Sequence, residues 1–263
     1  MDTSKARFLR ATALAIDPFR NMYVLDAGKR EVVKLDPKGA PTARTGGPGW
    51  VGSGVDAPKD VAATGLDVYV ADDGARRVVR FDRELGLVAE GQPGGASTEF
   101  GRPRSVALSR FGDLFVVDAE NERILQYPRD GGDARIFGDF RGGKGSLSMP
   151  LRVRVTGGDL VVVQDSASIV LFDIFGNFVR RLARDVVPQL RTFAVDDKNI
   201  YVLDGCSIVI LDAEGTLVSR IALSTDDGWP PCDEIVDIQV QHRILTVLTA
   251  TMAVSGPFPV PAR

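Results

Sequence analysis

One pattern recurs along almost the whole chain and restricts what it can fold into. Short apolar segments end at a regularly spaced aspartate, and the members of this series are Asp26, Asp72, Asp118, Asp165 and Asp204. Successive members lie 46, 46, 47 and 39 residues apart. Several strand-sized segments in each repeat, with no helical periodicity between them, are typical of the blades of a β-propeller.

Each copy divides into the same four parts. A first strand often follows a proline, a second ends at the recurring aspartate, a third ends in an aromatic residue or leucine, and a weaker fourth follows a turn. The turn reads Asp-Xaa-Xaa-Gly at residues 36–39, 173–176 and 212–215, where glycine supplies a positive φ. Five full copies and a degraded sixth predict an all-β fold, a six-bladed β-propeller of four-stranded antiparallel blades.

A single domain over residues 1–263 accommodates this ring. The sixth copy lacks an outermost strand of its own, and its end is rich in proline, which is unsuited to a central strand. We expect residues 5–10, which precede the first copy, to supply that strand and to close the ring. The expected blades are residues 11–45, 58–90, 103–138, 150–184, 190–224 and 234–263.

The third copy carries a family resemblance. Its segments 103–108 (Pro-Arg-Ser-Val-Ala-Leu), 112–118 (Gly-Asp-Leu-Phe-Val-Val-Asp) and 122–124 (Glu-Arg-Ile) resemble the NHL repeat, as does the stretch of glycines before Pro103. The resemblance covers nearly the whole chain and is strongest in copies two and three. It implies a six-bladed propeller, but propellers of this type serve as protein scaffolds, RNA binders and enzymes. The function must therefore be argued from a site.

Composition restricts the partners. The chain has 32 lysines and arginines against 35 aspartates and glutamates, so its net charge is −3. A chain without a cationic surplus is a poor non-specific ligand for nucleic acid or anionic membranes. No apolar run reaches the about 18–20 residues of a membrane helix, so we expect no membrane span.

RNA binding is the third functional class that we consider. RNA-binding NHL propellers carry a basic face, and acidic residues such as Asp73 and Glu120 interrupt the corresponding basic residues here. We therefore do not expect nucleic acid to be the partner. The arginines that could form such a face are Arg76, Arg77, Arg104, Arg123 and Arg152.

A propeller-type hydrolase or lyase is the alternative to a binding module. Lyases of similar shape rely on histidine, and the chain has one histidine, His242, which we place in a turn. Lactonase-like propellers hold a divalent cation in the central channel with glutamate, asparagine and aspartate, and Asn121 is the asparagine expected on that face. Because only this one asparagine lies on the expected face, the match to a lactonase site is poor, and we predict no metal and no cofactor.

The candidate binding face lies where the first strand of each copy begins, at the mouth of the channel. The ring expected there is polar and differs from copy to copy, unlike the recurring aspartates, which we interpret as structural acceptors of backbone N–H groups. Such a ring could consist of charges paired with one another, or it could recognise a small polar ligand or a loop of a partner. Its expected members are Ala13, Asp60, Ser105, Arg152, Thr192 and Asp237, flanked by Lys59, Arg104 and Arg191.

Long glycine-rich loops between the first four copies add three aromatic residues, Trp50, Phe100 and Phe140. No helix follows any of these loops, so they lack the mechanism of a phosphate-binding loop. Some of these rings could pack under their own loop, whereas an aromatic residue left exposed among arginines favours a protein-binding surface. We therefore predict a non-enzymatic module that binds a protein partner through its channel-mouth face.

The two cysteines complete the list of candidate residues. Cys206 follows the second strand of copy five, and Cys232 lies in the loop that leads into copy six. Both segments are expected on the same face of neighbouring blades, so a disulfide and a pair of free thiols both remain open, and we slightly favour the bond. A disulfide implies an oxidising, extracytoplasmic compartment, although residues 1–10 do not resemble a signal peptide, whereas free thiols would suit the cytoplasm.

Overall fold

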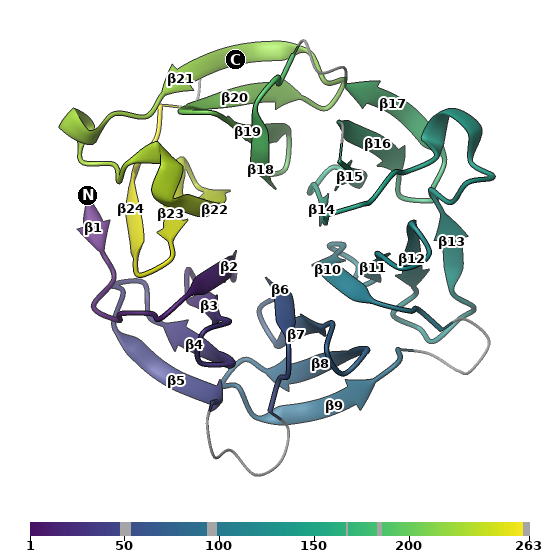
Figure 1. The fold of residues 1–263 in the computed structure, drawn as a ribbon, viewed down its shortest axis with the longest axis horizontal. Coiled ribbons are helices and arrows are strands. Elements are labelled where there is room, and N and C mark those ends of the chain that lie inside the picture. Colours follow the sequence, from purple (N-terminus) through teal and green to yellow (C-terminus); the bar gives the residue numbers. More distant parts are fainter. Residues whose placement is uncertain (48–53, 94–98, 167, 183–185, 260–263) are drawn as a thin grey trace.

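The computed structural model describes residues 1–47, 54–93, 99–166, 168–182 and 186–259, and it confirms the predicted propeller. Six four-stranded antiparallel sheets stand around a common axis (Figure 1). Blade one contains β2 (Ala11–Ile16), β3 (Met22–Asp26), β4 (Glu31–Leu35) and β5 (Pro41–Gly46). Blade two contains β6 (Pro58–Ala63), β7 (Asp67–Asp72), β8 (Arg77–Asp82) and β9 (Leu87–Gly91). Blade three contains β10 (Pro103–Leu108), β11 (Leu114–Asp118), β12 (Arg123–Tyr127) and β13 (Arg135–Phe137).

The second half of the ring follows the same order. Blade four contains β14 (Arg152–Val155), β15 (Leu160–Gln164), β16 (Ile169–Asp173) and β17 (Phe178–Leu182). Blade five contains β18 (Leu190–Val195), β19 (Asn199–Asp204), β20 (Ser207–Asp212) and β21 (Leu217–Ala222). Blade six contains β22 (Ile235–Gln241), β23 (Ile244–Thr249), β24 (Ala253–Pro257) and β1 (Asp2–Thr3).

Within the described residues, helical structure is confined to three short 3₁₀ turns, η1 (Gly143–Gly145), η2 (Thr225–Asp227) and η3 (Cys232–Glu234). Over the ranges that the structure describes, no helix has the length and apolar character that a bilayer crossing requires.

The core lies between neighbouring blades, so each sheet is buried on both faces. Val161, Val162 and Val163 of β15 are all fully buried, and because side chains alternate along a strand they face opposite ways. Val161 and Val163 pack with residues of blade three, while Val162 packs with residues of blade five. Burial on both faces explains the continuous apolar runs in the sequence.

The ring is closed from the N-terminus, but not by the residues that we expected. The closing strand is β1, in which Asp2 pairs with Ser255 and Thr3 with Val254, and Figure 1 shows it beside β24. Residues 5–10 instead cross from blade six to blade one without strand pairing. Phe8 is buried between these blades and donates its backbone N–H to the carbonyl of Thr251 at 3.0 Å.

The recurring aspartates are structural, as their repetition in five of the six blades suggested. Asp26 is fully buried and accepts the backbone N–H groups of Leu9 and Arg10 at 2.7 and 2.9 Å. Asp118 accepts those of Gly101 and Arg102 at 3.1 and 3.3 Å. The partners therefore come largely from the segment that enters the blade, in addition to the following turn, and these carboxylates hold the interblade connections in place.

Cys206 and Cys232 are joined by a disulfide, with their Cα atoms 5.2 Å apart. Cys206 lies between β19 and β20, and Cys232 opens η3 just before β22. The bond therefore links blade five to the sixth blade, whose four strands come from both ends of the chain.

We expect the unreduced, unfolded protein to contain no thiol that a thiol reagent can titrate. Because the bond closes a loop of 26 residues, reduction should lower the free energy of unfolding by about 3 kcal/mol in the chain-entropy account. A Cys206→Ser/Cys232→Ser variant is the control, since its stability should not respond to the reductant. Two titratable thiols in the unreduced protein would contradict the bond.

Candidate functional site

The beginnings of the inner strands surround a hollow at one end of the ring axis, which we call the channel mouth. Its volume is about 210 Å³. Four cationic side chains and one carboxylate line it, together with one amide, one hydroxyl and two aliphatic side chains. The lining residues are Lys59, Asp60, Arg104, Leu151, Arg152, Gln164, Arg191, Thr192 and Val236.

Asp60 is the centre of a buried ion pair below the mouth. Both of its oxygens accept from the guanidinium of Arg154, at 2.8 and 3.0 Å, and the hydroxyl of Ser105 donates to it as well. The backbone N–H of Val106 adds a fourth bond at 3.3 Å. Since these residues belong to β6, β10 and β14, one carboxylate connects the inner strands of blades two, three and four.

Asp237 likewise connects the inner strands of the remaining blades. It is fully buried, forms a salt bridge with Arg152 and accepts the backbone N–H of Leu14 at 2.9 Å. The hydroxyl of Thr192 lies 3.3 Å from the same carboxylate. These contacts reach from blade six to blades one, four and five, so two carboxylates together connect all six inner strands.

The Asp60–Arg154 pair is charged on both sides. Burial raises the pKa of Asp60, but the attraction of Arg154 and the hydrogen bonds from it outweigh burial, and the pKa lies below its usual value. Burial lowers the pKa of Arg154, and the nearby Asp60 carboxylate more than reverses that effect. The predicted ring therefore consists largely of charges paired with one another, which was one of the two interpretations of the sequence.

The rim of the mouth is different, because its cations are not fully neutralised. Arg104 is exposed and forms no salt bridge with any residue that the structure describes. Lys59 lies 3.9 Å from Asp73, a carboxylate that Arg102 already binds at 2.7 Å. Arg191 donates to the backbone carbonyls of residues 232, 233 and 235, and its guanidinium forms no salt bridge with a carboxylate in the described part of the chain.

The three aromatic residues proposed for the binding face have different outcomes. Phe140 is 82% exposed, and the guanidinium of Arg141 lies 5.3 Å from its ring centre. The expectation for Phe100 is wrong, because its side chain is only 3% exposed and packs in the interface of blades two and three. Its ring meets Tyr127 edge to face, with the ring centres 6.4 Å apart. Trp50 lies outside the described residues.

The basic face considered for RNA is largely neutralised. Of its five arginines, only Arg104 has no carboxylate partner in the described ranges. The other pairs are Arg76 with Glu120 at 3.4 Å, Arg77 with Asp72 at 3.2 Å, Arg123 with Asp118 at 3.0 Å, and Arg152 with Asp237.

The donor set at the mouth does not fit a divalent cation, which would need several available carboxylate or amide oxygens. Asp60 and Asp237 are engaged by guanidinium groups, and further cations surround them. The amide of Asn121 is bound to Asp118 at 2.7 Å. His242 lies in the turn after β22, at the opposite end of that strand from the mouth, so it cannot take part in chemistry there.

Arg154 and Gln164 belong to the site, although we did not select them from the sequence. Arg154 stands where copies one, two, three and five have alanine. An arginine at an otherwise alanine position of a strand that packs around the axis was the signal that could have identified it. Gln164 ends β15 and donates to the carbonyl of Arg191 at 3.3 Å.

Comparisons with known proteins support the fold and leave the function open. No family model matches the chain. The protein brain tumor of Drosophila melanogaster is 28% identical over 120 residues, which are 44% of this chain and 12% of that protein. The chain thus matches about an eighth of that relative.

Solved structures of low identity share the propeller. A streptogramin B lyase superposes with a TM-score of 0.66 at 10% identity, covering 97% of this chain and 96% of the other. A gluconolactonase from Xanthomonas campestris gives 0.65 at 14% identity, covering 96% and 87%. A virginiamycin B lyase from Staphylococcus aureus gives 0.64 at 12% identity, covering 98% and 85%. At these identities the likeness establishes the fold alone.

Proposed function

We propose that this propeller is a non-enzymatic protein-binding module whose channel mouth receives an acidic segment of a partner. The observation that carries the proposal is the positive charge of the rim, where Lys59, Arg104 and Arg191 surround the hollow. Among the described residues, Asp73 lies near Lys59 but is already bound by Arg102, and no salt bridge is found for Arg104 or Arg191. Complementary charge of this kind steers association and selects the partner.

The size of the mouth favours a segment of protein over a free small molecule. Its volume of about 210 Å³ lies below the about 300–1,000 Å³ of typical small-molecule pockets. One or two acidic side chains, or a terminal carboxylate, fit such a space. The guanidinium of Arg104, which is already exposed and unpaired within the described ranges, is suited to bidentate binding of a carboxylate.

The enzyme alternative gains no specific support from the site. The solved relatives are described as lyases and a gluconolactonase, but their identity to this chain is 14% or less. A histidine-dependent lyase would need a histidine at the channel mouth, but His242 lies at the opposite end of its strand. The aspartates of the mouth are paired with arginines, so few of their oxygens are available to a divalent cation.

The disulfide supports a location for this module. We propose that the protein works in an oxidising, extracytoplasmic compartment, because disulfides are rare and short-lived in the reducing cytosol. The compartment itself could be tested by fractionation of the native cells.

The binding proposal is tested by fluorescence anisotropy with a labelled octaglutamate peptide. We expect the wild-type protein to bind this probe with an affinity that falls between about 50 mM and about 200 mM salt, since the contact is electrostatic. A Lys59→Glu/Arg104→Glu variant should bind at least about tenfold more weakly, because it reverses two of the three exposed charges of the rim.

The matched control reverses two exposed charges at the other end of the strands. Arg20 and Lys198 lie in the turns after β2 and β18, so an Arg20→Glu/Lys198→Glu variant carries the same change in net charge. Its affinity should stay within about twofold of wild type, apart from the general effect of net charge. Equal losses in both variants, or tighter and steeply salt-dependent binding of a labelled octauridine RNA, would overturn the proposal.

A further inference from the structure

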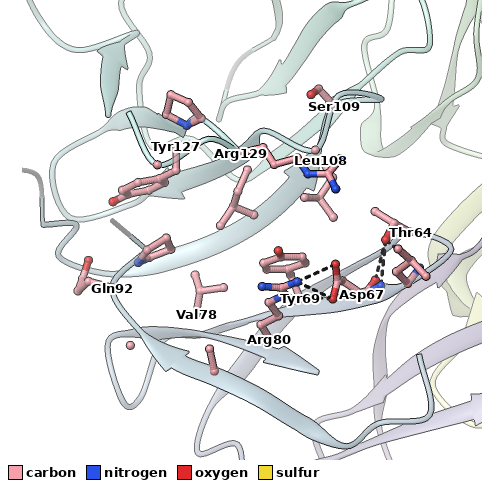
Figure 2. Close-up of a pocket in the computed structure, with 18 of the residues that line it drawn as sticks. Thr64, Asp67, Tyr69, Val78, Arg80, Gln92, Leu108, Ser109, Tyr127 and Arg129 are labelled. Atoms are coloured by element: carbon pink, nitrogen blue, oxygen red, sulfur yellow. Dashed lines mark hydrogen bonds and ion pairs between the residues drawn. The ribbon is translucent and has the colours of Figure 1, made fainter. Parts of the chain in front are cut away.

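A cavity lies between blades two and three, away from the channel mouth, and we call it the interblade cleft. Its volume is about 600 Å³. Figure 2 shows Asp67, Tyr69 and Arg80 on the side of blade two, with Tyr127 and Arg129 on the side of blade three. A cavity of this size at a regular interface of a repeat protein calls for an explanation.

The first cause is a glycine in the outermost strand of blade two. Gly91 pairs with Val78, in the register that pairs Phe137 with Ile124 in blade three and Leu182 with Ile169 in blade four. Phe137 and Leu182 are both buried and fill the next interface of the ring. Gly91 has no side chain to do so, and a Cβ built on it would meet nothing within 4 Å.

The second cause is a glycine in the turn of blade three. Leu85 of blade two and Gly131 of blade three occupy the same turn position, with φ values of 67° and 79° and with backbone N–H bonds to the residue three before. Leu85 is 4% exposed and plugs the interface of blades one and two. A Cβ at Gly131 would meet nothing within 4 Å, whereas at the equivalent Gly176 it would meet Phe137 at 2.6 Å.

The open space changes the environment of one tyrosine. Blades one, three and five carry Tyr23, Phe115 and Tyr201 three residues before the recurring aspartate, and all three are fully buried. Tyr69 occupies this position in blade two and is only half-buried, with its ring against the cleft. Two glycines therefore convert a closed interface into a cavity with an accessible aromatic wall.

The chemistry of the walls indicates what could occupy the cleft. Val78, Leu108 and Leu114 form an apolar lining between the two tyrosines. Most of the lining charges are already paired: Arg80 binds Asp67 through two hydrogen bonds of 3.0 and 3.1 Å.

Arg129 is the exception among these charges. Arg110, the other lining arginine of blade three, binds Asp159 at 2.8 Å. The guanidinium of Arg129 has no carboxylate partner in the described ranges. Burial raises the pKa of Tyr69 above its usual value, and the positive charge of Arg129 is close enough to oppose that rise. The cleft thus combines an apolar interior with one positive charge at its edge.

We propose that the interblade cleft is a binding site for a small aromatic carboxylate. The ring system would lie against the half-buried ring of Tyr69 and over the apolar lining of the cleft, where aromatic stacking and apolar burial both contribute. The carboxylate would accept hydrogen bonds from Arg129. The site is independent of the acidic segment proposed for the channel mouth, because the two cavities share no lining residue.

Isothermal titration calorimetry with 2-naphthoate and its neutral counterpart 2-naphthylmethanol tests this assignment. We expect saturable binding of 2-naphthoate at a stoichiometry of one, and weaker binding of the alcohol. An Arg129→Gln variant should lose about tenfold in affinity for the carboxylate while its affinity for the alcohol stays within about twofold, because only the charged contact is removed. The control is Arg83→Gln, which changes the equivalent arginine in the turn of blade two and should leave both affinities unchanged.

A second variant fills the cavity without removing any polar group. Gly131→Leu introduces the residue that blade two carries at this turn, where Leu85 adopts a φ of 67°. A leucine at the φ of 79° of Gly131 costs some backbone strain, but it should abolish binding of both probes, and circular dichroism shows whether the protein stays folded. Absence of saturable binding to wild type, unchanged binding in Gly131→Leu, or equal losses of both probes in Arg129→Gln would each overturn the proposal. If Gly131→Leu does not fold, the contrast between the two probes in Arg129→Gln decides.

Discussion

Replacing Arg154 by methionine is expected to lower the free energy of unfolding by about 3–5 kcal/mol. The guanidinium of Arg154 is buried and donates two hydrogen bonds to the carboxylate of Asp60. It also donates to the carbonyl of Val153 at 2.8 Å. Methionine fills a similar volume but leaves the buried carboxylate with one hydroxyl and one backbone amide as its hydrogen-bond donors and without its salt bridge. Equilibrium unfolding in urea, followed by fluorescence and circular dichroism, measures the loss.

Two further variants separate the buried charge from the general effect of removing an arginine. Arg104→Met removes an exposed cation of the same inner ring and should change the stability by no more than about 0.5 kcal/mol. An Asp60→Asn/Arg154→Met variant should recover part of the loss, because no uncompensated charge then remains buried. A loss for Arg154→Met as small as that for Arg104→Met would show that the pair does not hold the inner strands together.

The architecture was accessible from the sequence because a propeller blade is built from local pairings. Each strand pairs with its neighbours in the chain, so the turn glycines and the recurring aspartates repeat with the blade. Only the closure joins distant parts of the chain, and there the expectation was inaccurate by a few residues. Nothing in the sequence distinguishes Asp2 and Thr3, which form the strand, from the residues that follow them.

The site was accessible only in part, since alignment of the copies identifies the side chains at the axis without their partners. The alignment identified Asp60 and Asp237. It did not show that Arg154 reaches across from blade four to bind Asp60. It also treated every interface as equivalent. The interblade cleft arises from two glycines that line the same interface, and that coincidence is visible only when the register of β9 and the turn after β12 are known.

The glycine-rich loops gave the clearest error, because their composition suggested that an aromatic residue within them would be exposed. For Phe100 the opposite holds. Both polar groups of its backbone are bound by the side chain of Gln92, at 3.1 and 3.2 Å, and its ring is directed into the interface beside Val106 and Leu114. A residue at the end of a long loop thus serves as core for the strand that follows.

Phe100→Ala is therefore expected to destabilise the protein by about 3–5 kcal/mol, the usual cost of removing a buried phenylalanine ring. The loss combines the apolar surface of a ring that is 3% exposed with its edge-to-face contact to Tyr127. Phe140→Ala is the matched control, because that ring is 82% exposed, and it should change the stability by no more than about 0.5 kcal/mol. Urea unfolding of the two variants distinguishes a core residue from a surface residue: if both lose the same small amount, Phe100 belongs to the surface and the packing described here between blades two and three is wrong.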